Sequence, residues 1–83
     1  MHAPPSHPDV FGRVLRRIRR ERDLSQEALA RAAGLAPNHV SELERAKRDP
    51  RLTTLVQLAD ALGMPVGELL AAFDRQREQL SDA

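Results

Sequence analysis

The sequence predicts an all-α fold of five helices in a single small domain. Apolar residues recur at helical spacing along the chain, and no segment alternates apolar and polar residues as a half-buried strand would. Glycine and proline fall between the apolar runs, where helices are expected to end and begin. With 83 residues, the chain is long enough for one core without a disulfide or a metal.

The first helix is expected from Asp9 to Arg22, because its apolar residues follow the i, i+3, i+4, i+7 pattern of an amphipathic helix. These residues are Phe11, Val14, Leu15 and Ile18. The preceding segment, residues 1–8 (MHAPPSHP), is rich in proline and has nothing to bury. We expect it to be a disordered N-terminal tail.

The second and third helices are expected within residues 26–45, QEALARAAGLAPNHVSELER. Ser25 is a good N-cap for the second helix, and Gly34 stands where a helix commonly ends in a left-handed residue. The third helix is expected to begin near Pro37, with Ala36 as its N-cap. Ala30 is small enough to let the two helices approach closely, and Val40 and Leu43 form an apolar stripe that packs against the second helix.

The fourth helix is expected from about Leu52 to Leu62, and Gly63 ends it. It should bury Leu52, Leu55, Val56, Ala59 and Leu62. A fifth helix is expected near Pro65, and residues 75–83 are expected to be a helical extension or a tail. The folded domain would therefore span residues 9–74.

Charge is divided between the two halves of the chain, although the net charge is only +1. Residues 13–48 carry ten basic and five acidic side chains, a local net charge of +5. Residues 49–83 carry three basic and six acidic side chains, a local net charge of −3. The positive half contains the second and third helices, and a surface helix held at a fixed angle by a partner helix is suited to enter the DNA major groove.

Several other classes of function are disfavoured. The chain has no cysteine, and its three histidines have no metal-ligand spacing, so we expect no disulfide, no metal and no cofactor. No nucleophile, acid/base pair or phosphate-binding loop indicates an enzyme. No apolar run approaches the length of a signal-peptide core or a membrane span, so we expect a cytoplasmic protein without a membrane partner.

The sequence resembles the phage repressor and Cro type of helix-turn-helix protein, the Xre family, over about residues 11–73. The resemblance lies in the runs LSQEALARAAGL, VSELERAKRDPRL and LVQLADALGMPVGELL. It implies a five-helix repressor-like domain that binds a palindromic double-stranded DNA operator as a homodimer, with RNA polymerase as a candidate further partner. The short chain is similar to the small regulators that control restriction-modification operons, and small phage and antitoxin regulators share this length.

The resemblance assigns the base-reading face to the third helix, from about Pro37 to Arg45. Its base-reading positions are Pro37, Asn38, Ser41 and Glu42. Asn38 is suited to a bidentate pair with adenine, and Pro37 offers only apolar contact. Glu42 either accepts a hydrogen bond from cytosine or forms an intramolecular ion pair.

Other positions match residues that contact the phosphate backbone or stabilise the fold in this family. The phosphate-contacting candidates are Gln26, His39, Arg45, Lys47, Arg48 and Arg51. Arg19 and Glu44 match an ion pair that links the first helix to the end of the third. The chain departs from the family pattern at Ala36, which replaces a capping Ser or Thr, and at Ala46 and Asp23, which replace frequent glycines. A positive φ at Ala46 would cost about 1 kcal/mol of strain, whereas Asp23 tolerates this conformation better.

Dimerisation is predicted from apolar residues in excess of what so small a core can cover. We expect Leu69 and Leu70 in the core, and Leu58, Val66 and Phe73 at a two-fold interface. The alternative to a DNA-binding regulator is a helical protein–protein adaptor, for example an antitoxin-like partner, in which the third helix contacts a polypeptide and the arginines only keep the surface hydrated.

Overall fold

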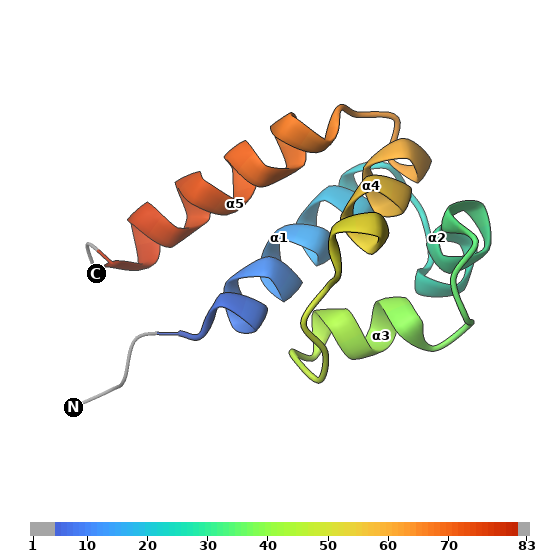
Figure 1. Cartoon of the computed structure of the whole chain (residues 1–83), viewed down its shortest axis with the longest axis horizontal. Helices are drawn as coiled ribbons and strands as arrows, with labels where there is room; N and C mark the ends of the chain where they lie inside the picture. Colours follow the sequence, from blue (N-terminus) through green and yellow to red (C-terminus); the bar gives the residue numbers. More distant parts are fainter. Residues whose placement is uncertain (1–4, 82–83) are drawn as a thin grey trace.

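The computed structural model describes residues 5–81, which form five helices and no strand (Figure 1). They are α1 (His7–Glu21), α2 (Gln26–Ala33), α3 (His39–Glu44), α4 (Leu52–Ala61) and α5 (Val66–Ser81). Helix α1 runs through the middle of the molecule, where it packs against α3 on one side and α5 on the other. Helix α2 packs against α3 and α4. The all-α class predicted from the sequence is confirmed.

Helix α1 begins at His7, two residues before the predicted start. The Ser6 hydroxyl accepts a hydrogen bond from the Asp9 backbone N–H, and the Asp9 carboxylate accepts one from the Ser6 backbone N–H. This capping box, together with Pro8 in the first turn, stabilises the helix start. The predicted tail is therefore wrong for residues 7 and 8, which are helical, and residues 1–4 lie outside the described part of the chain.

All five helices contribute to one apolar core. Its members with no exposed surface are Val14, Leu15, Leu29, Ala30, Val40, Leu43, Leu58, Ala59 and Leu69. Within residues 5–81, no buried side-chain nitrogen or oxygen lacks a hydrogen-bond partner. Isolated helices of this length are barely stable in water, so packing in the shared core is what stabilises them.

The first four helices all end in the same way, with one residue in the left-handed backbone conformation. These residues are Asp23 (φ 55°), Gly34 (φ 72°), Ala46 (φ 60°) and Gly63 (φ 71°). After each of them, the next backbone N–H bonds back to the carbonyl five residues earlier, as in Leu35 to Ala30 at 2.8 Å and Lys47 to Glu42 at 2.8 Å. This is the Schellman arrangement, which satisfies carbonyls that the helix leaves free. Ala46 therefore carries the strain of a non-glycine residue in the left-handed region.

Helix α3 begins later than predicted, at His39 instead of Pro37. Pro37 and Asn38 form a turn, closed by a 3.0 Å hydrogen bond from the His39 N–H to the Ala36 carbonyl. Ala36 is therefore not the N-cap. Asn38 holds that position, and its side chain makes no capping hydrogen bond.

The buried face of α4 differs from the prediction. Leu52 is 72% exposed and Val56 is 38% exposed, whereas Leu58 and Thr54 are buried. Six of the ten residues of this helix are apolar and they are spread around its axis, so their spacing fits several rotations. The predicted burial of Leu52 and Val56 is wrong. Leu70, also expected in the core, is 39% exposed.

Neither α4 nor α5 alone could cross a membrane. No single helix within residues 5–81 is long and apolar enough, and the α4–α5 pair reaches that length only across a break with a bend of 103°. Helix α5 continues through residue 81, so the predicted extension after residue 74 is helical as far as the structure describes it.

Candidate nucleic-acid interface

Helix α3 is a short surface helix fixed by two neighbours. Val40 and Leu43 are fully buried, and they attach one side of α3 to α1 and α2. The side that carries Asn38 and Arg45 is open to solvent. In Figure 1, α2 and α3 lie at the end of the molecule away from α5 and are joined by a short connection. This is the helix pair that residues 26–45 predict.

An ion pair joins α1 to the last residue of α3. Arg19 Nε lies 2.6 Å from Glu44 Oε2, and Arg19 Nη2 lies 3.0 Å from Glu44 Oε1. The two side chains are only 9% and 3% exposed. The hydrogen bond to Glu44 is the main cause that raises the pKa of Arg19, outweighing the desolvation that acts to lower it. The pair expected between these residues is therefore present, with the bidentate geometry that guanidinium and carboxylate groups favour.

The same network includes Gln26 at the start of α2. Gln26 Nε2 donates to Glu44 Oε1 at 3.0 Å, and Arg19 Nη1 donates to the Leu24 carbonyl at 2.8 Å. One N–H of the Gln26 amide, the group predicted to contact a phosphate, is thus already used within the fold. Three helices meet in this network, which fixes the angle of α3.

A close backbone approach reinforces this connection at Gly12. A Cβ atom at Gly12 would lie 2.7 Å from the Glu44 carbonyl oxygen and 2.8 Å from the Leu43 carbonyl oxygen. Both distances are shorter than van der Waals contact allows, so only glycine lets α1 approach the end of α3 this closely. Gly12 was not among the residues predicted from the sequence to have a role. A lone glycine within an amphipathic helix was the available signal.

Residues predicted to read bases fall into two groups. Pro37 and Asn38 are exposed, whereas Ser41 and Glu42 are half-buried. The Asn38 side chain is left available at the start of α3, since it makes no capping hydrogen bond. This position presents an amide with both a donor and an acceptor to solvent.

Glu42 forms the ion pair that was one of its two expected roles. Arg48 Nε donates to Glu42 Oε1 at 3.0 Å, and the two side chains are 51% and 24% exposed. A pair with this exposure contributes about 1 kcal/mol or less, so DNA can separate it at small cost. In the free protein, however, one candidate base reader and one candidate phosphate contact neutralise each other.

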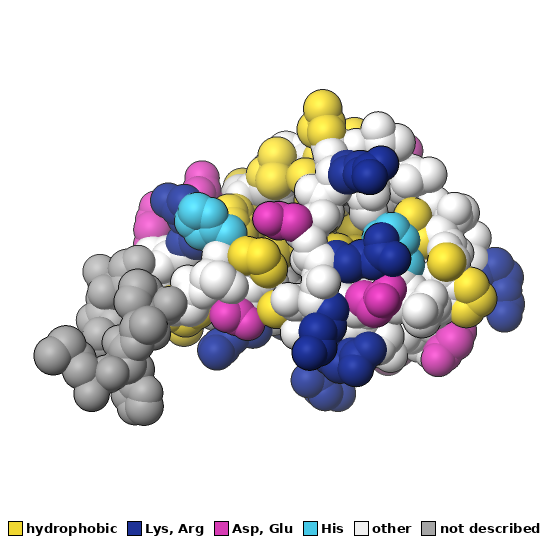
Figure 2. All heavy atoms as spheres, turned by 60° about the horizontal axis from the view of Figure 1, so that its bottom comes forward, with side chains coloured by type: hydrophobic (Ala, Val, Ile, Leu, Met, Phe, Trp, Pro, Cys, Tyr) yellow, Lys and Arg dark blue, Asp and Glu magenta, His cyan; other side chains and the backbone are white. Residues whose placement is uncertain are grey.

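Four exposed basic side chains lie at the end of α3 and in the loop that follows it. Arg45, Lys47, Arg48 and Arg51 are exposed, and His39 is half-buried. Figure 2 shows Lys and Arg side chains gathered in the middle of the face that contains α3 and this loop, with carboxylates among them. Guanidinium and ammonium groups around a surface helix suit contact with DNA phosphates.

The predicted dimer-interface residues are not all available at the surface. Leu58 has no exposed area, so its assignment to an interface is wrong. Val66 and Phe73 are half-buried, and the Phe73 ring packs 6.5 Å from the Phe11 ring. Among the residues whose side chains the structure describes, the exposed large apolar ones are Leu52, Val56 and Leu70.

Arg22, which sequence reasoning counted only as positive charge, has a structural contact. Its Nε donates to the Leu62 carbonyl at 2.7 Å, which satisfies a free carbonyl at the end of α4. No spacing rule connects residues 40 positions apart, so the sequence carries no signal for this contact.

Comparisons with known proteins agree with this architecture. Residues 15–69 match the family model described as Helix-turn-helix. The HTH-type transcriptional regulator y4dJ of Sinorhizobium fredii is 40% identical over 65 residues, which cover 78% of this chain and 84% of that protein. The phage transcriptional repressor RstR of Vibrio cholerae is 36% identical over 75% of this chain, which spans 56% of the repressor's length.

Solved structures show the same arrangement of helices. The restriction-modification controller protein C.AhdI of Aeromonas hydrophila is 39% identical, with a TM-score of 0.72 over 75% of this chain and 94% of that one. The regulator ClgR of Corynebacterium glutamicum has a TM-score of 0.87 and 25% identity over 96% of this chain and 85% of that one. The residues that match the family model include α2 and α3, and the solved structures share this arrangement of helices. The chain therefore belongs to the Xre-type helix-turn-helix family of transcriptional regulators.

Proposed function

We propose that this protein regulates transcription by binding a palindromic double-stranded DNA operator as a homodimer, with α3 in the major groove. The observation that carries the proposal is the exposed amide of Asn38 at the start of a surface helix whose angle is fixed by the Arg19–Glu44 pair. An amide in this position can pair bidentately with adenine, while the exposed basic loop residues contact phosphates. Support for regulation also comes from relatives named as transcriptional regulators.

Within this proposal the protein acts in the cytoplasm and has no catalytic activity of its own. RNA polymerase is a candidate partner at the operator. The exposed apolar side chains of α4 and α5, Leu52, Val56 and Leu70, are the proposed two-fold interface. Two such protomers would place their α3 helices about 34 Å apart, one turn of DNA.

The experiment is selection of bound sites from a pool of random duplexes, using the wild-type chain. We expect an enriched palindrome whose half-sites are separated by about one helical turn. Asn38→Ala should relax the preference at one base pair in each half-site, by about 1–3 kcal/mol. Arg75→Gln, on the exposed surface of α5, is the matched control and should leave that preference unchanged.

The rival function, a protein-binding adaptor, predicts a different result. An adaptor would bind random duplex DNA hardly at all, and no motif would be enriched. A DNA-binding regulator should bind random duplexes with an affinity that falls steeply with salt. Absence of both motif and salt-dependent binding would contradict the proposal.

A further inference from the structure

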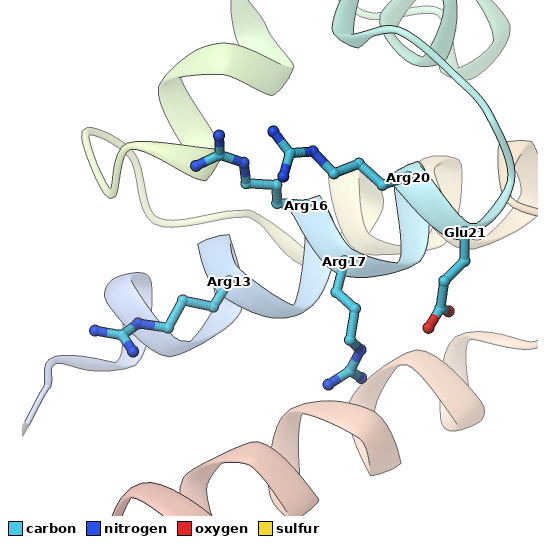
Figure 3. A pocket seen from close by; sticks show the side chains of 5 residues that line it. All are labelled: Arg13, Arg16, Arg17, Arg20 and Glu21. Carbon is cyan, nitrogen blue, oxygen red and sulfur yellow. The ribbon is translucent and has the colours of Figure 1, made fainter.

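The outer surface of α1 carries a row of four exposed arginines that the interface described above does not use. Arg13, Arg16, Arg17 and Arg20 follow the spacing i, i+3, i+4, i+7, so they lie along one face of the helix. Together with Glu21 they line a shallow, open groove of about 510 Å³ (Figure 3).

This row has little compensation within the fold. Like charges three or four residues apart destabilise a helix, and the four arginines make four such pairs. Within residues 5–81, none of them has a carboxylate within 4.0 Å. Only Arg17 has a side-chain hydrogen bond, from its Nη1 to Gln76 Oε1 of α5 at 3.1 Å. No ion pair within residues 5–81 offsets this repulsion, and an anionic partner would reduce it.

The directions of the side chains separate the row into two parts. In Figure 3, Arg17 and Glu21 point toward α5, whereas Arg16 and Arg20 extend toward the side of α1 on which α3 lies. Helix α1 meets the end of α3 at Gly12, one helical turn before Arg16. Arg16 and Arg20 therefore extend the positive surface of the α3 loop around to α1.

The position of α4 determines how the arginine row is oriented relative to the two-fold axis of the proposed dimer. Helix α4 lies in front of α1 in Figure 1 and behind it in Figure 3, so α4 and the arginine row are on opposite sides of α1. If two protomers meet through Leu52 and Val56 of α4, the arginine row faces away from the two-fold axis. It then lies over the outer end of each half-site.

We propose that Arg16 and Arg20 bind backbone phosphates of the DNA that flanks each half-site on its outer side. This inference rests on the proposed function. The guanidinium group is a planar fork of donors that matches phosphate oxygens, and it stays charged at every working pH. These contacts lengthen the footprint of the protein beyond the bases that α3 reads, without adding sequence information.

The test compares Arg16→Gln/Arg20→Gln with wild type on the operator obtained by selection. Two duplexes are used, one that ends at the outer edge of the half-sites and one with ten further base pairs on each side. Wild type should bind the longer duplex more tightly, and the double variant should bind both equally. On the longer duplex, the variant should lose roughly 60-fold in affinity per protomer at 0.1 M salt. Its salt dependence, log K against log [salt], should become shallower by about 1.8 per protomer, the value for two released counterions.

A control variant and a stability measurement separate this effect from general changes. Arg31→Gln/Arg75→Gln removes the same charge from exposed positions on α2 and α5, and it should keep the preference for the longer duplex. The melting temperature of Arg16→Gln/Arg20→Gln should equal or exceed that of wild type, because the like-charge repulsion is reduced. Lost binding would then not reflect lost folding.

Two results would overturn the inference while leaving the operator binding intact. One is wild-type affinity that does not depend on the flanking base pairs. The other is an equal salt dependence for Arg16→Gln/Arg20→Gln and for its control Arg31→Gln/Arg75→Gln. The arginine row would then face an acidic protein surface or solvent instead of DNA. If wild type binds no duplex at all, the proposed function itself fails.

Discussion

At the scale of single residues, the orientation of α3 depends on a few contacts with α1. Arg19, Glu44 and Gln26 share one hydrogen-bonded network, and Gly12 allows the backbones to touch. The raised pKa of Arg19 means that the charge of this arginine persists throughout ordinary conditions. The ion pair therefore contributes its full stabilisation at every pH below the pKa that Arg19 has in the unfolded chain. This stabilisation is lost only in strongly alkaline solution, where Arg19 loses its proton.

Removing either partner of the ion pair should destabilise the protein. Arg19→Ala and Glu44→Ala each leave a largely buried charge unpaired, which costs about 3 kcal/mol or more. Thermal denaturation should show a clear drop in melting temperature for both single variants. The double Ala variant should lose less than the sum of the two, and unchanged melting temperatures in both single variants would exclude this role.

Replacing Gly12 should also destabilise the fold. In Gly12→Ala the new methyl group meets two backbone carbonyls of α3, and overpacking of this kind costs about 1–3 kcal/mol. Gly67→Ala in α5 is the matched control, because no atom lies within 4 Å of the added Cβ. The control should gain up to about 1 kcal/mol in free energy of unfolding. Equal gains in the two variants would show that α1 and α3 tolerate a wider separation.

At the scale of the helices, the four Schellman ends determine where the chain turns. Gly34 and Gly63 adopt the left-handed conformation without strain, whereas Ala46 adopts it with a φ of 60°. The loop that follows Ala46 contains Lys47 and Arg48, so this strained residue directs the basic loop away from α3. The Glu42–Arg48 pair then links the loop back to the helix.

Ala46→Gly should stabilise the protein by about 1 kcal/mol, because glycine carries no Cβ penalty at positive φ. Gly34→Ala introduces that penalty at the end of α2 and should cost a similar amount. Chemical denaturation of the two variants measures the two opposite shifts. A loss of stability in Ala46→Gly would mean that the entropy of the unfolded glycine outweighs the relief of strain.

Glu42→Gln should release Arg48 from its ion pair and make it available to a phosphate. Binding to random duplex DNA should strengthen, and the slope of log K against log [salt] should become steeper by about 0.9 per protomer. Glu78→Gln on the exposed surface of α5 makes the same change in charge away from α3. An equal effect in both variants would attribute the gain to net charge alone.

At the scale of the whole molecule, the exposed large apolar side chains of residues 5–81 lie on α4 and α5, whereas most Lys and Arg side chains lie on α1 and between Arg45 and Arg51. This separation suits a protein that contacts DNA with one surface and a second copy with another. Leu52, at 72% exposed, is the most accessible of the three large apolar side chains.

Leu52→Asp/Val56→Asp should convert a dimer into a monomer while the helical content is retained. The physical reason is that two carboxylates would have to be desolvated at the proposed interface. Sedimentation at tens of micromolar measures the change, with circular dichroism as the check on folding. Leu58→Asp, which places a charge in the core, should unfold the chain instead. A monomeric wild type under these conditions would exclude the proposed interface.

The sequence by itself determined the helices, the two glycines that end α2 and α4, and the pair of helices suited to DNA. These features follow from local rules: apolar spacing, caps and the conformational freedom of glycine. The Arg19–Glu44 pair could be predicted only because the sequence resembles a family with a matching pair.

Only the tertiary structure decided which face of α4 is buried, where α3 begins, and what Gln26, Glu42 and Gly12 contact. A helix with apolar residues on several sides has no unique inward face until its neighbours are placed, so Leu52 and Leu58 exchanged their expected environments. Long polar side chains likewise bond to whichever groups lie near them in the folded chain. Gln26 bonds to Glu44 in this way, and Arg48 bonds to Glu42. Such contacts carry no signature in residue spacing, because packing between helices creates them.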